Sequence, residues 1–176
     1  ASLGRLGHRD GDADAVFAAL LAAVRSPAAR DRFVRHAAAL AIAGVAAPAD
    51  LDSLVRDPSP DVRLAACITL RRLKDERLAT LVADESAVVA TEAARAIHDL
   101  ALDSQLPALA ARAATGPADD AFLRRAVSAA EQVGTPEAVQ SLLAVVGRAD
   151  ASDEARSEAV SYTHLTLPTY SLCRSR

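Results

Sequence analysis

The sequence contains few aromatic residues and lacks tryptophan, methionine and asparagine altogether. Only 3% of its 176 residues are aromatic, and it has no tryptophan and no methionine, although 51% of the residues are hydrophobic. Alanine supplies much of that apolar content, and alanine has the highest helix propensity of all residues. Because large aromatic side chains bury the most area, a core without them favours stacked helices over a compact sandwich.

Patterns that would indicate a membrane span or a chemical site are also missing. No apolar run reaches the roughly 18 residues of a membrane-spanning helix. There is no metal-ligand spacing of His or Cys, no glycine-rich phosphate loop, and no nucleophile elbow or Ser-His-Asp pattern. We therefore expect no catalytic, cofactor-binding or metal-binding residues. The formal charge of −3 does not favour nucleic acid as a partner.

Isolated cysteine and histidine residues have structural interpretations. Cys67 lies within an apolar helical stretch and is predicted to be a buried thiol, which behaves as a small hydrophobic side chain. Outside the C-terminal tail, the histidines are scattered, at His8, His36 and His98. His98 precedes Asp99 near an expected helix end, where a cation complements the helix dipole.

What the sequence does contain is a repeat. "VRHAAALAIAGV", "VRLAACITLRRL" and "VVATEAARAIHDL" align at Val34, Val62 and Val89. A period of roughly 28 residues indicates a solenoid. The helices expected from this repeat cover residues 34–45, 62–73, 88–100, 122–134 and 152–160.

A shorter helix is expected before each of these. Apolar residues recur there at spacings of three and four, which mark one face of a helix. These shorter helices are expected at residues 14–26, 49–57, 75–84, 104–114 and 136–148. The sequence thus predicts an all-α fold, an α-solenoid of about five short helix pairs, the last one truncated.

The turn before the second helix of the second pair resembles that of HEAT repeats. The resemblance rests on Asp57, Ser59, Pro60, Asp61, Val62, Arg63 and Ala66. The repeats are shorter than the roughly 40–47 residues usual for HEAT. In length they are similar to the short HEAT-like repeats of bilin lyases. The aromatic positions of tetratricopeptide repeats and the T-P-L-H motif of ankyrin repeats are absent.

A narrower resemblance concerns residues 57–159. They are similar to the helical region of large planctomycete and verrucomicrobial proteins that also carry a sugar-dehydrogenase-like propeller and a c-type haem domain. The matching segments are Glu92–Asp99, Leu106–Leu109, Leu123–Arg125, Gly134–Glu137 and Glu154–Ala159. The resemblance implies a fragment of a multidomain protein in the periplasm or at the cell surface, with the other domains as partners. It assigns no redox chemistry to any residue of this chain.

Arginines on the second helices form the candidate binding set. They are expected to line the concave face as Arg35, Arg63, Arg71, Arg95 and Arg124, with Arg72 and Arg125 beside them. One interpretation is a groove for an acidic partner, because arginine forms bidentate pairs with carboxylates. The other is a structural ladder, in which Arg63 pairs with Asp61 or with acids of the adjacent repeat. We favour the ladder.

The C-terminal tail differs from the rest of the chain. Residues 160–176 contain both tyrosines and no acidic residue. Back-translated, "SYTHLTLPT" and "CRSR" resemble two parts of a sequencing adapter in the right order, and Tyr170–Leu172 between them take roughly the place of a sample index. We therefore expect a HEAT-like array over residues 1–159, and an adapter-derived, disordered or irregular segment over residues 160–176. Without Arg174 and Arg176, 18 basic and 23 acidic residues leave a formal charge of −5.

Together these features predict a non-catalytic scaffold that mediates protein–protein or interdomain contacts, within a larger and haem-containing dehydrogenase-like protein. No cofactor, nucleic acid or membrane span is expected. The alternative is a bilin-lyase-like protein that holds a tetrapyrrole in its groove. That function needs exposed His, Cys or Tyr side chains, of which the sequence offers few.

Overall fold

A computed structural model describes residues 12–166 of the chain, and no strand occurs among them. The chain divides into two compact units after Leu81. Unit 1 is described over residues 12–81 and unit 2 over residues 82–166. Both consist of helices joined by short turns, so the predicted all-α fold of stacked helix pairs is confirmed.

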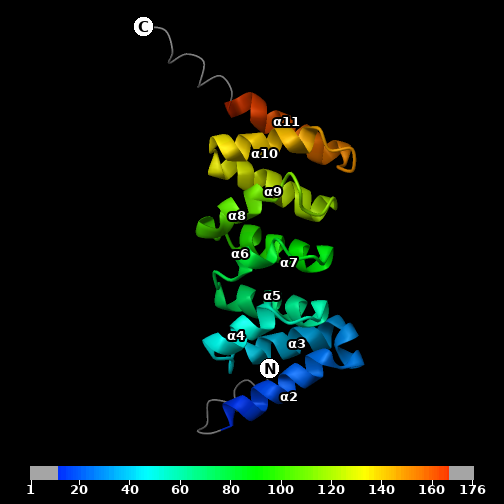
Figure 1. Ribbon diagram of the computed structural model, residues 1–176, viewed down its shortest axis with the longest axis vertical. Coiled ribbons are helices and arrows are strands. Elements are labelled where there is room, and N and C mark those ends of the chain that lie inside the picture. Colours follow the sequence, from blue (N-terminus) through cyan, green and yellow to red (C-terminus); the bar gives the residue numbers. More distant parts are fainter. Residues whose placement is uncertain (1–11, 167–176) are drawn as a thin grey trace. The chain divides into compact units, whose positions relative to one another are not determined.

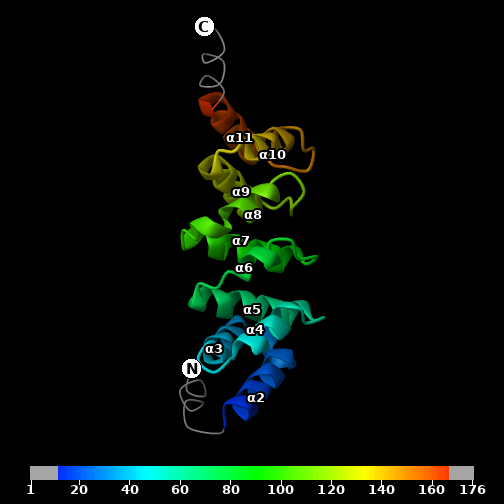
Figure 2. The same cartoon turned by 60° about the vertical axis from the view of Figure 1, so that its left-hand side comes forward.

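Unit 1 is built around its longest helix, α5. Its elements are α2 (Ala13–Arg25), the 3-10 helix η1 (Pro27–Arg30), α3 (Arg32–Ile42), α4 (Pro48–Val55), α5 (Pro60–Leu73) and α6 (Leu78–Leu81). Helix α5 contacts α2, α3, α4 and α6, and Figures 1 and 2 show α3 and α5 as neighbouring layers. The second helices of the first two pairs therefore pack on each other, as a solenoid requires.

Unit 2 has the same organisation around α9. Its elements are α7 (Ala87–Asp99), the 3-10 helix η2 (Asp103–Gln105), α8 (Leu106–Ala111), α9 (Asp120–Val133), α10 (Pro136–Val146) and α11 (Asp153–Thr166). Helix α9 contacts the second helices α7 and α11 and also the shorter helices α8 and α10. The second helices α7, α9 and α11 thus form a continuous layer within the unit (Figure 1).

Helix starts follow from proline and short polar side chains. Proline occupies the first turn of α4, α5, α8 and α10, where its missing N–H costs nothing. Asp31, Asp119 and Thr135 accept hydrogen bonds from the backbone N–H groups of Phe33, Phe122 and Ala138. These side chains satisfy donors that have no partner inside the helix.

Helix ends in both units share one geometry. In each case a residue with positive φ follows the helix. Lys74 (φ 55°) directly follows α5, Gly134 (φ 62°) directly follows α9, and Ala101 (φ 49°) comes two residues after the end of α7. The N–H of Asp75 donates to the carbonyl of Leu70, and that of Leu102 donates to the carbonyl of Ile97. This is the Schellman pattern. Its two acceptors occupy aligned repeat positions, although the sequence supplies glycine only at Gly134.

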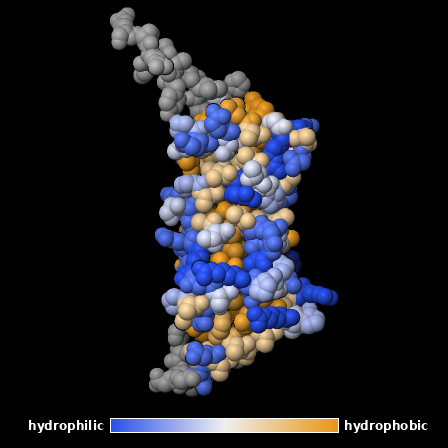
Figure 3. All heavy atoms as spheres, viewed as in Figure 1, coloured by the Kyte–Doolittle hydropathy of each residue, from blue (hydrophilic) through white to orange (hydrophobic). Residues whose placement is uncertain are grey.

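The repeat positions that align in the sequence form the cores. Ala38, Ala66 and Ala93 are buried, and Ile42, Leu70 and Ile97 are each 0% exposed. The predicted burial of Cys67 is confirmed. Over the face in view in Figure 3, hydrophilic side chains are interspersed with apolar ones, which fits helices that bury one side each.

Two expected boundaries were wrong. The helix expected at residues 75–84 is reduced to α6, because the Asp75 side chain accepts from the N–H of Arg77 and turns the chain first. The segment from 160 was expected to be irregular, but α11 continues through Thr166. Extending an existing helix costs little, and the next proline is Pro168. Residues 167–176 lie outside the described part.

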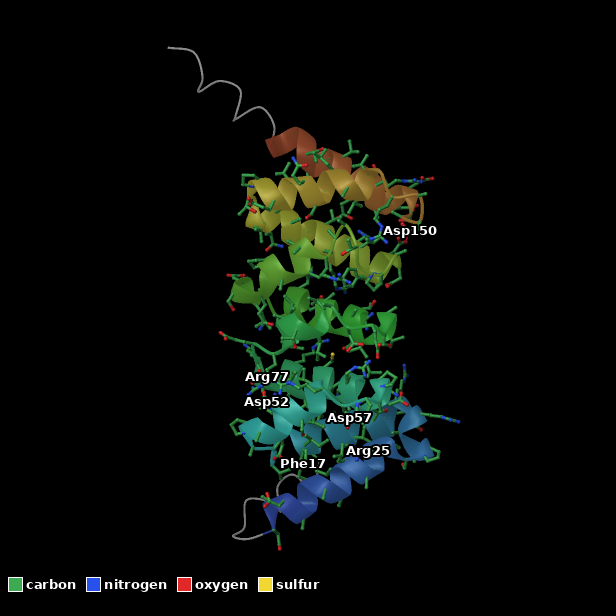
Figure 4. All side chains as sticks on the ribbon, in the orientation of Figure 1. Phe17, Arg25, Asp52, Asp57, Arg77 and Asp150 are labelled. Atoms are coloured by element: carbon green, nitrogen blue, oxygen red, sulfur yellow. The ribbon has the colours of Figure 1, made fainter. Side chains whose placement is uncertain are left out.

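An ion pair braces the loop between α10 and α11. Arg148 Nε and Nη2 donate to the two carboxylate oxygens of Asp150, both at 2.9 Å. Arg148 Nη1 donates to the carbonyl of Ala113 at 3.1 Å, which ties the loop to the end of α8. The hydrogen bond from Arg148 holds the pKa of Asp150, labelled in Figure 4, below its ordinary value.

Candidate functional site

Two of the five predicted arginines have the same structural role in unit 1. Arg35 Nη1 donates to the carbonyl of Ala29 at 2.9 Å, and Arg63 Nη1 donates to the carbonyl of Asp57 at 2.8 Å. Each acceptor lies in the segment before the second helix, Ala29 in η1 and Asp57 in the turn before α5. Arg63 also donates to the carbonyl of Pro58 and is only 7% exposed. These contacts fit the structural ladder, with backbone carbonyls of the preceding segment among the acceptors.

Asp57 completes this turn. Its carboxylate accepts from the N–H of Ser59 at 2.9 Å and from Arg25 Nη2 at 2.6 Å, and the residue is only 8% exposed. Figure 4 shows Arg25 and Asp57 reaching toward each other from α2 and from the turn before α5. Arg77 likewise bridges Asp52 and Asp75 within unit 1. The charged groups of this unit thus hold its turns together.

Two further predicted arginines, Arg71 and Arg95, are partly exposed to solvent. Arg71 is half-buried in the last turn of α5. Arg95 Nη1 bonds Glu92 at 3.0 Å on the same face of α7, and its side chain is 42% exposed. A pair spaced three residues apart on an exposed helix contributes roughly 0.2–0.5 kcal/mol.

The fifth predicted arginine, Arg124, lines a groove on the second-helix layer of unit 2. We call it the α7–α9–α11 groove. It encloses about 440 Å³ and is lined by His98, Asp120, Ala121, Arg124, Arg125, Ser128 and Glu158. The α9 residues fall three and four positions apart and therefore share one face of that helix. Arg125, the neighbour named in the sequence, belongs to the same groove.

Both groove arginines are engaged by acids. Arg124 Nε donates to Glu158 on α11 at 3.2 Å, and Arg125 Nε donates to Asp99 on α7 at 3.3 Å. Arg125 Nη1 also donates to the carbonyl of Ala121. Arg124 is 62% exposed and Arg125 is 25% exposed. The groove therefore has two ion pairs that cross between neighbouring helices.

A second cavity adjoins the groove along α11. It encloses about 560 Å³ and is lined by Arg124, Asp153, Glu154, Ser157, Glu158 and Ser161. The two cavities share Arg124 and Glu158. Together their walls carry four carboxylates and two guanidinium groups. Asp153 is paired with Arg156 at 2.6 Å, so the surplus of carboxylates is found at Asp120 and Glu154.

The structure brings together three residues whose sequence positions gave no such indication. His98 Nε2 lies 3.4 Å from Ser128 Oγ, and His98 Nδ1 lies 3.4 Å from Asp99 Oδ1. The order is that of a Ser-His-Asp relay. However, Ser128 is within α9, whose backbone N–H groups bond inside the helix, and Ser128 Oγ also accepts from Gln132. His98 and Ser128 therefore contribute polar groups to the wall of the groove.

Sequence analysis missed Ser128 and Glu158 as groove residues and assigned His98 only to a helix end. His98 does lie in the last turn of α7, as expected. Its contact with Ser128 joins residues 30 positions apart, close to the repeat spacing. That spacing is the signal that could have linked them.

Two findings concern other kinds of site. Within residues 12–166, no group of three or more His, Cys, Asp or Glu side chains is placed to hold a metal ion. In the same part of the chain, every helix is too short or too polar to cross a bilayer.

Comparison with known proteins bears on unit 1. A family model described as HEAT repeat matches residues 50–75. This segment is similar to a HEAT repeat. It covers most of α4, the turn with Asp57, and α5 with Arg63, and it therefore includes the residues on which the sequence resemblance rests. No curated protein and no solved structure matches the chain.

Proposed function

We propose that this chain is a non-catalytic scaffold of HEAT-like repeats that mediates protein–protein or interdomain contacts through its second-helix layers. The observation that carries the proposal is the α7–α9–α11 groove, which lies on the second-helix layer of unit 2. The HEAT match at residues 50–75 supports it, because stacked repeats build extended surfaces suited to protein partners.

For the parent, we propose a larger multidomain protein of the dehydrogenase-like, c-type haem class, in the periplasm or at the cell surface. The partner is then first another domain of that parent. This proposal rests on the resemblance of segments such as Glu92–Asp99 and Glu154–Ala159. We further propose that residues 160–176 derive from a sequencing adapter and that the native sequence departs after Ala159.

Both proposals are tested by recovering the source DNA with adapter-trimmed reads that extend beyond the present ends. We expect the bases after the Ala159 codon to change and the extended frame to encode a Cys-x-x-Cys-His motif. Return of the same bases from independent DNA overturns the adapter origin. An extended frame without a propeller or haem motif overturns the parent assignment.

The scaffold function is tested by expressing the flanking domains and measuring their binding to the repeat region by calorimetry. We expect a complex whose affinity Arg124→Glu changes, because this substitution breaks the Arg124–Glu158 pair and alters the charge of the groove. Arg32→Glu, on the exposed start of α3, is the matched control and leaves affinity unchanged. An equal change with both variants, or no complex, contradicts the assignment. A spectral shift on mixing with bilin supports the tetrapyrrole-binding alternative instead.

A further inference from the structure

The two units have similar folds but very different net charges. Over residues 12–81, nine Asp and Glu face ten Arg and Lys, which gives a formal charge of +1. Over residues 82–166, thirteen Asp and Glu face six Arg, which gives −7. A field of one sign over a surface attracts partners of the opposite sign and raises their association rates. Unit 2 as a whole therefore attracts cations.

The α7–α9–α11 groove and its adjoining cavity are negatively charged, like unit 2 as a whole. Arg124 and Arg125 are each neutralised by an acid, Glu158 and Asp99. Two further carboxylates on the walls, Asp120 and Glu154, have no hydrogen-bond or ion-pair partner within residues 12–166. The hydroxyl groups of Ser128 and Ser157 add further acceptors. The walls therefore contain hydrogen-bond acceptors that are available to a partner, beside two arginines whose charges are already neutralised.

From the charge of unit 2 and the open carboxylates of this groove, we propose that the α7–α9–α11 groove binds a partner segment rich in lysine or arginine. Side chains of the partner reach Asp120 at the α9 wall and Glu154 at the α11 wall, on either side of the Arg124–Glu158 pair. This inference rests on the proposed scaffold function and gives it a partner chemistry. It is opposite in charge to the acidic partner that was one interpretation of the arginines, and neither carboxylate lies after Ala159.

The two carboxylates could also be placed where they are to stabilise their helices, and the experiment must distinguish this role from partner binding. Asp120 and Glu154 lie in the first turns of α9 and α11, where acids stabilise a helix through its dipole. Asp103 and Glu137 occupy first turns too, in η2 and α10, but neither lines the groove. The double substitution Asp103→Asn with Glu137→Gln therefore changes the net charge by the same amount away from the groove, and it also removes one first-turn acid of an α-helix, α10.

The test titrates the full chain into two fluorescein-labelled peptides and follows fluorescence anisotropy. One peptide alternates lysine with glycine, and the other alternates glutamate with glycine. We expect the lysine peptide to bind and the glutamate peptide not to bind. Binding should weaken as ionic strength rises from about 0.01 M to about 0.15 M, because the Debye length shortens from about 30 Å to about 8 Å.

The variants then locate the site. The double substitution Asp120→Asn with Glu154→Gln should weaken lysine-peptide binding by about tenfold, because it removes both carboxylates that would form ion pairs with lysine side chains of the peptide. The control pair should change it by less than about twofold. Equal weakening by both pairs overturns the groove as the site. Binding of the glutamate peptide alone, or of neither peptide, overturns the partner chemistry while leaving the calorimetric test of the scaffold function unaffected.

Discussion

Unit 1 and unit 2 put arginines at corresponding repeat positions to different uses. In unit 1, Arg35 and Arg63 donate to backbone carbonyls of the preceding turn. In unit 2, Arg124 follows Leu123 as Arg63 follows Val62, yet it reaches across to Glu158 on the next second helix. The repeat position therefore determines the backbone position of the arginine. The acceptors offered by the neighbouring turn or helix determine whether its side chain stabilises the fold or lines a surface.

The net charges extend this comparison. Unit 1 is nearly neutral, and many of its charged groups brace turns, as in the Arg25–Asp57 and Arg77–Asp52 pairs of Figure 4. Unit 2 has a surplus of seven negative charges over its described residues, and it contains the groove. Stability should therefore depend on arginine in unit 1, whereas recognition should depend on charge in unit 2.

The largest predicted effect tests whether the units are separate bodies. Phe122 in α9 is 0% exposed, and its ring lies so close to Gly116 that a Cβ there would collide with it. Phe122→Ala should destabilise by about 3–5 kcal/mol through loss of burial and a cavity. Hydrogen exchange followed by mass spectrometry should show the loss of protection in α7 to α11 and not in α2 to α5.

The control for this experiment is Phe33→Ala in unit 1. Phe33 is 70% exposed and its ring lies 4.8 Å from the guanidinium carbon of Arg32, so the cost should stay below about 1 kcal/mol. Equal loss of protection in both units of the Phe122 variant would mean that they unfold together, which contradicts the division after Leu81.

The second prediction compares corresponding arginines directly. Arg63→Ala removes the donor to the carbonyls of Asp57, which is buried, and of Pro58, which is exposed. Leaving the buried Asp57 carbonyl without this donor should cost about 1–3 kcal/mol. Arg124→Ala breaks an exposed pair and should cost less than about 1 kcal/mol. Urea unfolding monitored by circular dichroism measures both variants, and similar losses would show that the two arginines do not differ in structural role.

Much of the fold could be predicted because burial follows local periodicity. The alignment of Ala38, Ala66 and Ala93 identified residues that the structure buries, since each lies on the apolar face of its own helix. The start of the third short helix, α6, could not be predicted in this way. Asp75 bonds the N–H of Arg77, and that local bond competes with the helix.

The site was less predictable because its contacts join different repeats. All five candidate arginines lie on second helices, but their sequence positions do not distinguish the buried Arg63 from the exposed Arg124. That depends on which acceptor the turn or the next helix presents. The approach of His98 to Ser128 depends likewise on how α7 packs against α9. The charge difference between the units was present in the sequence but needed the boundary at Leu81 to become visible.

The third prediction concerns a feature that the units share. Lys74 in unit 1 and Ala101 in unit 2 have positive φ values, at which an L-residue with a Cβ is strained by roughly 1–2 kcal/mol. Lys74→Gly and Ala101→Gly should therefore each stabilise by up to about 1 kcal/mol, once the greater chain entropy of glycine is deducted. Thermal melting measures the gain. Stabilisation in one unit only would show that the two helix ends are not equivalent.

The smallest predicted effect concerns Tyr162, at the end of unit 2 where α11 packs on α9. Burial raises the pKa of Tyr162 above its ordinary value, and the negative charges of Glu158 and Glu131 and a hydrogen bond to Glu158 add to this. A raised pKa in the folded state means that the neutral phenol stabilises the fold. That contribution is complete below the unfolded value of about 10 and is lost as the pH rises through the folded pKa.

The measurement is an absorbance titration of phenolate in the Tyr170→Phe variant, which leaves Tyr162 as the single tyrosine. Its midpoint should lie above that of the same variant in urea. The control is Glu131→Gln, which removes one of the charges that raise the pKa of Tyr162 and should lower the midpoint slightly. A folded midpoint equal to that in urea would mean that Tyr162 does not pack between these acids. The negative surplus of unit 2 would then not extend to this end of α11.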